Sequence, residues 1–385
     1  MLCHVLAAIL GLILALSNSA NAACECGYSV NKTSDQAHAV YTELMENDFL
    51  HTMVENATEV GWRPQEYNMS AEQARGPYGK EFFVSNIETN PLKDPWSWSG
   101  ESQNGQDAGL ELWVRGDHSH GFVSGSEVVS VRNDMTYGSY RIGMKLPRGD
   151  SGTCAAFFWY YNNSQEIDME FLSHQFNGST GAVNLVLQTP EAVNDGFDAS
   201  NTSVFKVYPL GFRPDEKFHE YRFDWSPESV AFYIDGELAY VMAENVPTTS
   251  SHLFMNHWSN GDPSWSAGPP DSDVAMTVSY VKAYFNSSDP ARADAYNSRC
   301  SEYNPANVCQ IPDQTVPPDP SGPDGNTTAK TYFFSLDEGH APGQTVYNHT
   351  NGDLKGGAMG MLDSVPSFSV FAPFFIALFS WVFTL

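Results

Sequence analysis

Three carboxylates stand at every second position in the run Glu166-Ile167-Asp168-Met169-Glu170. Side chains alternate between the two faces of a β-strand, so this spacing places all three acids on one face and the apolar Ile167 and Met169 on the other. On a helix the middle acid would point away from the outer two. Because crowding like charges costs free energy, we expect such a row to be kept for its chemistry.

The chemistry that needs two neighbouring carboxyl groups is retaining glycoside hydrolysis. One ionised carboxylate attacks and one protonated carboxyl serves as acid and base, about 5–5.5 Å apart. Strand residues four apart have Cα atoms separated by roughly 13 Å, so only long side chains can close that distance. Glutamates at the outer positions fit this need, and Asp168 between them could hydrogen-bond one glutamate and help to separate the two pKa values.

Two plainer interpretations of the acid row compete with catalysis. The three acids could form a solvated strand face, or they could bind a metal ion. Calcium sites draw ligands from loops and backbone carbonyls as well, so we disfavour the metal interpretation. We expect no metal at these residues and no cofactor, while a structural calcium ion elsewhere remains compatible with the sequence.

The elements that must position the acids are β-strands. From about Lys80 to Phe285, short strand-like runs alternate with turn signals, including Asp235-Gly236, a dipeptide typical of hairpins. The pattern predicts a single all-β domain, a β-sandwich with a jelly-roll course. We also expect a short helix over residues 35–47, capped by Ser34, and an added edge strand within residues 329–336.

The motif Glu-x-Asp-x-Glu, followed by Phe171-Leu172, resembles the active-site strand of glycoside hydrolase family 16. The resemblance extends to residues 138–145 upstream and to residues 219–227 and 232–236 downstream, and covers roughly residues 28–288. It implies a concanavalin A-like lectin/glucanase sandwich, with Glu166 as nucleophile, Asp168 as its helper and Glu170 as acid/base. The spacing without an extra residue before Glu170 is that of lichenases, xyloglucan transglycosylases and fungal wall crosslinking enzymes.

The resemblance implies a retaining, endo-acting β-glucan hydrolase or transglycosylase. Its substrate would be cell-wall polysaccharide, either β-1,3-glucan or mixed-linkage β-1,3-1,4-glucan. Both activities use the same three acids, so the sequence leaves open whether water or a sugar hydroxyl is the acceptor. The alternative from another class is a non-catalytic, lectin-like carbohydrate-binding module on the same fold.

Aromatic and amide side chains near the acids are the candidates for binding sugar. Among them, Trp258 and Trp265 are expected in the cleft rather than in the core, and His257 could serve either a substrate or a structural hydrogen bond. A turn signal at residues 161–164 leaves open which way the side chain of Trp159 points. Asn184 and Gln188 could equally lie on a solvated strand face. The predicted substrate-binding residues are Trp159, Asn184, Gln188, His257, Trp258 and Trp265.

Six cysteines occur in the chain, and Cys3 lies in an N-terminal apolar segment. The other five predict two disulfides and one free thiol. Neighbouring Cys24 and Cys26 are too close to pair comfortably with each other, so we expect them to pair with Cys300 and Cys309, in either order. Cys154 would then be a buried free thiol.

Both ends of the chain have the pattern of processing signals. Residues 1–22 combine an apolar segment with a small-residue cleavage pattern, which predicts a signal peptide. Residues 357–385 end in an uncharged apolar tail behind a polar, small-residue stretch, which predicts a glycolipid-anchor propeptide with Gly356 as the attachment residue, ahead of Asn351. A membrane-spanning helix is the alternative; two prolines and the lack of a basic flank argue against it.

These features predict four regions: the signal peptide, a catalytic domain over residues 23–288, a Cys-clipped segment with a Pro-rich linker and polar stalk over 289–356, and the propeptide. Nine Asn-x-Ser/Thr sequons predict a glycosylated, secreted protein. Acidic residues outnumber basic ones 46 to 19, so nucleic-acid binding is not expected. We expect a monomer on a fungal cell surface or wall. Its substrate would be polysaccharide, and it would contact a membrane only through its lipid anchor.

Overall fold

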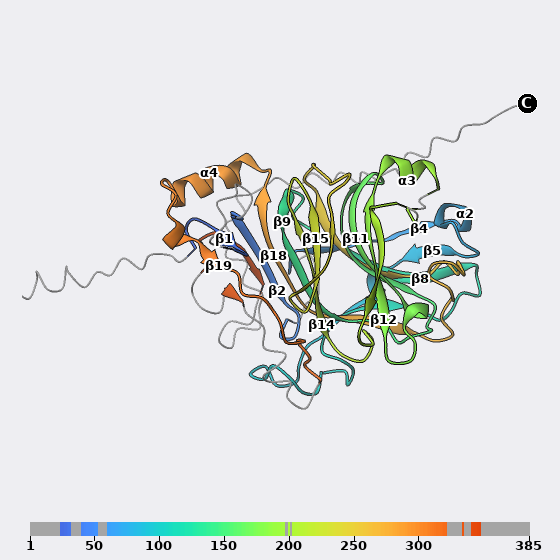
Figure 1. Cartoon of the computed structure of the whole chain (residues 1–385). Coiled ribbons are helices and arrows are strands. Elements are labelled where there is room, and N and C mark those ends of the chain that lie inside the picture. Colours follow the sequence, from blue (N-terminus) through green and yellow to red (C-terminus); the bar gives the residue numbers. More distant parts are fainter. Residues whose placement is uncertain are drawn as a thin grey trace, which may run out of the picture.

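Two nine-stranded β-sheets pack face to face, beside one short two-stranded sheet (Figure 1). The computed structural model describes residues 24–31, 40–52, 60–196, 199–200, 202–321, 333–334 and 340–347, and the strands are counted within these ranges. Most of the described strand pairs are antiparallel. The parallel pairs join residues 79–82 to 122–125, residues 45–47 to 345–347, and residues 28–29 to 309–310. The prediction of an all-β sandwich with a jelly-roll course is confirmed.

The first sheet carries the acid strand near its middle. Its strands in order are β13 (Phe205–Leu210), β12 (Gly181–Gln188), β11 (Gln165–Leu172), β10 (Cys154–Asn162), β17 (His252–Trp258), β8 (Phe122–Ser130), β5 (Gly79–Phe82) and β4 (Tyr67–Met69), with β3 (Trp62–Pro64) also paired to β8.

The second sheet contains the two longest strands of the described chain. Its order is β16 (Glu237–Met242), β15 (Val230–Ile234), β14 (His219–Trp225), β9 (Met135–Lys145), β18 (Val274–Ser287), β2 (Glu43–Asp48) and β20 (Thr345–Tyr347), with β7 (Gly109–Val114) on β18 and β6 (Ile87–Asn90) on β7.

Short elements complete the fold. The small sheet pairs β1 (Tyr28–Ser29) with β19 (Cys309–Gln310). The described helices are α2 (Ala71–Ala74), α3 (Pro190–Asn194), α4 (Pro290–Arg299) and the 3-10 turns η2 (Val84–Asn86), η3 (Ser173–Gln175) and η4 (Pro305–Asn307). Within the described ranges, none of these helices has the length and apolar character needed to span a membrane.

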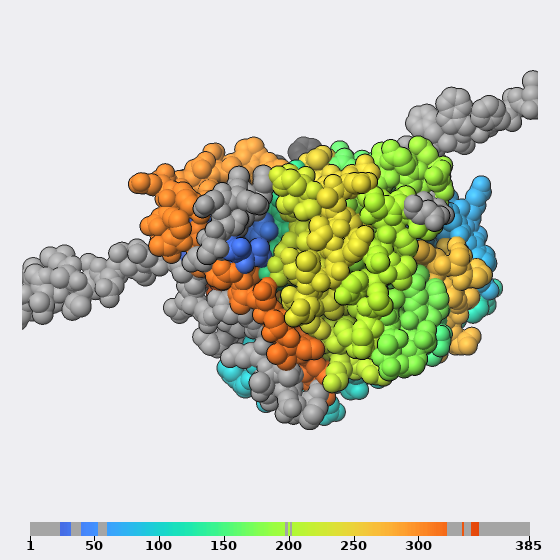
Figure 2. Space-filling model, in the orientation of Figure 1, coloured from blue at the N-terminus to red at the C-terminus, as the bar shows by residue number. Residues whose placement is uncertain are grey.

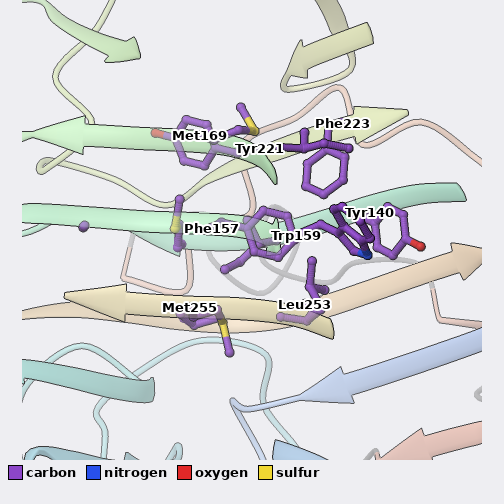
Figure 3. Packing of buried hydrophobic residues seen from close by; sticks show 14 of the residues in the cluster. Tyr140, Phe157, Trp159, Met169, Tyr221, Phe223, Leu253 and Met255 are labelled. Carbon is purple, nitrogen blue, oxygen red and sulfur yellow. The ribbon is translucent and has the colours of Figure 1, made fainter. Parts of the chain in front are cut away.

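The core lies between the two nine-stranded sheets. Phe157 and Trp159 of β10 and Met169 of β11 project into it, where they meet aromatic rings of the second sheet (Figure 3). The Trp159 ring centroid lies 4.6 Å from that of Trp225. Burying a large apolar side chain of this kind contributes about 1.5–3 kcal/mol. This packing holds one face of β11 inward, so the other face must point away from the core.

The predicted hairpin at Asp235-Gly236 is confirmed. Both residues have positive φ, 47° and 78°, and they connect β15 to β16. A two-residue turn with positive φ at both positions matches the right-handed twist of the flanking strands, and glycine reaches that conformation without strain.

The expected helix over residues 35–47 is wrong where the structure describes it. Residues 43–48 form strand β2, which pairs with β18 from Phe285 to Tyr280. Every residue of β2 is buried, so cross-strand pairing and packing on two sides outweigh the helical pattern seen in the sequence. Residues 34–39 lie outside the described residues.

The expected edge strand within residues 329–336 is not formed by its described members. Phe333 and Phe334 are buried as ring contacts of Trp98, Tyr28 and Tyr284 rather than as a strand. Residues 345–347 instead supply the strand that pairs with β2. The remaining residues of the predicted segment lie outside the described ranges.

The cysteine prediction is confirmed and its open order is resolved. The disulfides are Cys24–Cys309 and Cys26–Cys300, and Cys154 is free and buried. The start of the described chain is therefore tied to the segment that follows the last long strand.

The segment predicted to be a linker packs against the domain. Residues 309–321 run along the strands of the second sheet, and Figure 2 shows this orange segment beside the yellow strands. The Pro312 carbonyl accepts a hydrogen bond from Arg141, Asp313 forms an ion pair with Arg222, and Asp319 is buried. Within the predicted Pro-rich linker, residues 318–320 are buried. The expected signal peptide, Gly356 and the apolar tail lie outside the described residues.

Candidate active site

The acid row lies on the face of β11 that points away from the core. Glu166 and Glu170 are partly exposed and Asp168 is buried, whereas Ile167 and Met169 are fully buried between the sheets. The alternation expected from the sequence is therefore realised. We call this outward face of the first sheet the acid face, since the three carboxyl groups mark its middle.

Strand register extends the acid face to both sides. Residues directly opposite each other in antiparallel strands share a face. One row across the sheet, through Glu170, consists of Glu127, Asn256, Ala156, Glu170 and Asn184. A parallel row through Glu166 places Tyr160 on one side and Gln188 on the other.

Burial and mutual repulsion raise the pKa values of the acid row. Burial is the largest cause for each group, and the charge of Glu170 raises the pKa of Glu166 and Asp168 further. Asp168, the most buried, has a pKa well above its usual range and hydrogen-bonds to Glu166. This hydrogen bond lowers the pKa of Glu166, but burial outweighs it and raises the pKa of Glu166 to about 8. The row titrates as a unit, because its members interact strongly.

Two weak donors reach one oxygen of Glu170. The Cys154 thiol lies 3.5 Å and the Trp265 indole nitrogen 3.4 Å from Glu170 Oε1. Both lower the pKa of Glu170 against the effect of burial. The second oxygen, Oε2, receives no hydrogen bond from the part of the chain that the structure describes.

Two cations stand close to the acids. Lys80 Nζ lies 4.0 Å from the centroid of the Trp258 ring, and its charge acts on both Glu127 and Glu170. Arg75, which follows α2, interacts electrostatically with Glu166 and Glu170. Its guanidinium also donates to the Gly196 carbonyl at 3.3 Å, after α3. The cations partly offset the negative charge of the row.

A fourth carboxylate on the acid face was not anticipated from the sequence. Glu127 of β8 accepts hydrogen bonds from the Tyr67 hydroxyl at 3.2 Å and the Asn256 amide at 3.1 Å. Burial raises the pKa of Glu127. The signal that could have found it is a single acid at an alternating position in the otherwise uncharged strand run Phe122–Ser130.

Residues 93–282, which include the whole acid row, match the family model described as "Glycosyl hydrolases family 16". These residues, just under half of the chain, are similar to that family, and we call this region the family 16 domain. The family resemblance seen in the sequence is thereby supported by an independent comparison of the domain.

The family 16 domain is similar to several curated bacterial proteins. A "Beta-glucanase" of Paenibacillus polymyxa is 34% identical over 144 residues, which are 34% of this chain and 52% of that protein. A "Beta-glucanase" of Brevibacillus brevis is 28% identical over 238 residues, 55% of this chain and 83% of that protein. The chain spans about half the length of the first curated relatives that it matches.

Solved structures resemble the domain as well. A prokaryotic β-1,3-1,4-glucanase (lichenase) from a mouse hindgut metagenome has a TM-score of 0.46 and 22% sequence identity. The match covers 63% of this chain and 98% of that chain.

Two of the predicted substrate-binding residues of the family 16 domain lie in the core. Trp159 is fully buried opposite Ile167, and its indole donates to the Met135 carbonyl at 3.2 Å. His257 is fully buried, with Nδ1 2.8 Å from the Leu112 carbonyl, and burial lowers its pKa to about 4. The prediction that Trp159 binds substrate is therefore wrong. For His257 two roles were open, a hydrogen bond to substrate or a structural hydrogen bond, and the structure shows the structural one.

The other four predicted binding residues do lie on the acid face. Asn184 is buried beside Glu170 and is occupied by hydrogen bonds to the Glu170 carbonyl and Gln175. Gln188 is half-buried opposite Glu166, and among the described residues its Oε1 has no hydrogen-bond partner. Trp258 lies opposite Cys154, and Trp265 reaches Glu170. The structure thus brings these side chains together around the acids.

Within the described ranges, no group of three or more histidine, cysteine, aspartate or glutamate side chains is arranged to hold a metal ion. The acid row itself is spread along a strand rather than closed around a point.

Proposed function

We propose that the family 16 domain is a retaining enzyme that cleaves β-glucan internally, with Glu166 as nucleophile and Glu170 as acid/base. The observation that carries this proposal is the difference between the two glutamates. Glu166 shares a hydrogen bond with Asp168, which lowers the pKa of Glu166 against the effect of burial, whereas one oxygen of Glu170 has no hydrogen bond among the described residues. Two carboxyls in unlike environments are what an acid and a nucleophile require.

The reaction proceeds in two displacements. Glu166 attacks the anomeric carbon and forms a glycosyl ester, while Glu170 gives its proton to the departing glycosidic oxygen. Glu170, now a carboxylate, removes a proton from the acceptor hydroxyl as that oxygen attacks the anomeric carbon. The ester bond breaks, Glu166 leaves as a carboxylate, and the anomeric configuration is retained.

The acid face supplies groups that suit a neutral polysaccharide. Gln188 Oε1 and Asn256 Oδ1 are buried oxygens without hydrogen-bond partners among the described residues, which makes them acceptors for sugar hydroxyls. The Trp258 ring offers an apolar surface for a sugar face. Relatives that carry the name "Beta-glucanase" support a β-glucan as the substrate class. Its linkage, β-1,3 or mixed β-1,3-1,4, is part of the proposal.

We further infer that the protein works as a glycosylated monomer outside the cell, at a fungal plasma membrane or wall, held by a glycolipid anchor at Gly356. The sequence patterns at both ends and the sequons support this location. The two disulfides fit an oxidising compartment. Mass spectrometry of the mature C-terminus, with and without phospholipase treatment, tests the anchor; an intact residue 385 would contradict it.

Product analysis tests the activity and identifies the acceptor. The protein is incubated with laminarin or lichenan and a fluorescent oligosaccharide, and products are separated while the anomeric configuration of new ends is followed by NMR. Free reducing ends indicate hydrolysis, and a lengthened fluorescent product indicates transglycosylation. Glu166→Gln should abolish either product and preserve the fold. Glucan binding without any product in the unmodified protein would replace the enzyme by a lectin-like module.

A further inference from the structure

Cys154 is a buried thiol at the edge of the acid row, outside both disulfides. It begins β10 and faces the acid face, opposite Leu172 on one side and Trp258 on the other. Its Sγ lies 3.5 Å from Glu170 Oε1, within reach of a weak S–H donor. Burial and the nearby carboxylates raise the pKa of the thiol, so it keeps the hydrogen that it can donate.

Trp265 approaches the same oxygen from a different element. Its indole nitrogen lies 3.4 Å from Glu170 Oε1, and an indole can only donate. The two donors come from the start of β10 and from the loop over residues 259–268. Both are directed at Oε1, and neither bonds Oε2.

The loop that carries Trp265 is held in place at two points. Asn260 accepts from the Ser266 hydroxyl at 2.8 Å and donates to the Ala74 carbonyl at 2.7 Å. Gly268 also packs directly on Gly152, because a Cβ at residue 268 would lie 2.3 Å from the Gly152 carbonyl oxygen. Gly152 stands two residues before the thiol, so the positions of the two donors are mechanically linked.

We propose that Cys154 and Trp265 are positioning residues that clamp Oε1 of Glu170 and leave Oε2 to exchange the proton with substrate. This rests on the proposed function of Glu170 as acid/base. A carboxyl that rotates freely presents either oxygen, whereas one held at Oε1 keeps Oε2 in reach of the glycosidic oxygen. The same two donors stabilise the carboxylate that Glu170 becomes after protonating the leaving group.

Several charged groups besides the clamp face Glu170. Glu166 and Asp168 belong to its own strand, Lys80 approaches from β5, and Arg75 approaches from the end of α2. Removing the thiol changes none of these four groups. A change in the titration of Glu170 in such a variant therefore reports the lost donor.

The test combines kinetics with a direct titration. Cys154→Ala and Trp265→Phe each remove one donor and keep an apolar group in place. Each should lower kcat by about 5-fold, the worth of one hydrogen bond, with KM little changed. The basic limb of the kcat/KM pH profile should move to higher pH, because the carboxylate has lost stabilisation. Val230→Ala, a core variant of β15 in the second sheet, serves as a control that loses stability without moving the limb.

Carbon-13 NMR of labelled glutamate, with the Glu170 signal assigned by its loss in Glu170→Gln, gives a readout that does not require turnover. The pH midpoint of the Glu170 titration should rise in Cys154→Ala and rise further in the variant that combines Cys154→Ala with Trp265→Phe. An unmoved or lowered midpoint in both single variants would overturn the clamp. If the variants raise the midpoint but the unmodified protein turns over no glucan, the clamp is supported and only the proposed catalysis is refuted.

Discussion

Asn256 on β17 lies directly opposite Glu127 on β8, and its amide nitrogen donates a hydrogen bond of 3.1 Å to the Glu127 carboxylate. The Tyr67 hydroxyl donates to the other carboxylate oxygen at 3.2 Å. Both oxygens of Glu127 are therefore oriented, in a group two strands away from β10 and three from the acid row. An oriented, partnered carboxylate on the acid face is suited to hold sugar hydroxyls, and it defines the first prediction.

Glu127→Gln should weaken binding of glucan oligosaccharides by about 1–3 kcal/mol, since a charge-assisted acceptor is lost. Affinity is measured by calorimetry in a Glu166→Gln background, so that no substrate is consumed. Glu111→Gln is the matched control, because Glu111 is a buried acid on the second sheet with partners Asn90 and Trp113. Equal loss of affinity in both variants would mean that Glu127 acts only through the fold.

His257→Gln should flatten the acid side of the stability profile. Burial lowers the folded-state pKa of His257 to about 4, below the value of an unfolded histidine. Between pH 6.5 and 4 the unfolded chain therefore binds more protons, and stability falls as pH falls. The slope from this one group approaches about 1.4 kcal/mol per pH unit. Urea unfolding across this range measures it.

The exposed His120 supplies the control for that measurement. His120→Gln should keep the slope of the unmodified protein, whereas His257→Gln should lose part of it. A profile for His257→Gln that runs parallel to the unmodified protein from pH 6.5 to 4 would show that burial of His257 contributes nothing to the acid sensitivity.

Glu220→Gln should destabilise the fold strongly. Glu220 is fully buried in the second sheet, where it accepts from the Tyr280 hydroxyl at 2.7 Å and lies 3.5 Å from Lys282 Nζ. Removing the charge of one partner of a buried ion pair costs about 3–5 kcal/mol. Burial lowers the pKa of Lys282 to about 8, so part of the loss should be recovered as pH rises and Lys282 gives up its proton.

Asp313→Asn offers a matched comparison on the same sheet. Asp313 also pairs with a buried cation, Arg222, but its side chain is 54% exposed. Its loss should cost less than about 1 kcal/mol. Denaturant titration of both variants ranks them, and similar losses at the two sites would contradict the dependence on burial.

Cys24→Ser combined with Cys309→Ser should lower the free energy of unfolding by about 2–5 kcal/mol. This disulfide joins residues 285 apart in sequence and fixes the start of the segment that covers the second sheet. The Cys26–Cys300 pair remains as an internal control, because it anchors the same region at another point. Unchanged unfolding in the absence of reductant would show that packing alone holds the segment.

The acid row, the hairpin at Asp235-Gly236 and the partners of the disulfides were all predictable from the sequence. Each depends on local rules: a two-residue period in a strand, positive φ in a two-residue turn, and the short separation that keeps Cys24 from pairing with Cys26. These rules act within a few residues, so no knowledge of distant contacts is needed to apply them.

The direction of Trp159 and the strand at residues 43–48 depended on pairing between distant segments. The register of β10 shifts between Tyr160 and Asn162, after Trp159, so this tryptophan keeps the inward phase of Ile167. Residues 43–48 extend because β18 supplies the partner groups from more than 200 residues away. Such contacts leave no periodic trace near the residue that they orient.

The environment of Glu170 likewise belongs to the tertiary structure. The sequence by itself determined that three acids share one strand face, because side-chain alternation is a local property. Only folding brought the thiol of Cys154 and the indole of Trp265, 111 residues apart in number, to the same carboxylate oxygen. A hydrogen bond requires its two atoms to be close in space. Here the close packing of Gly268 on Gly152 brings the two donors to Glu170.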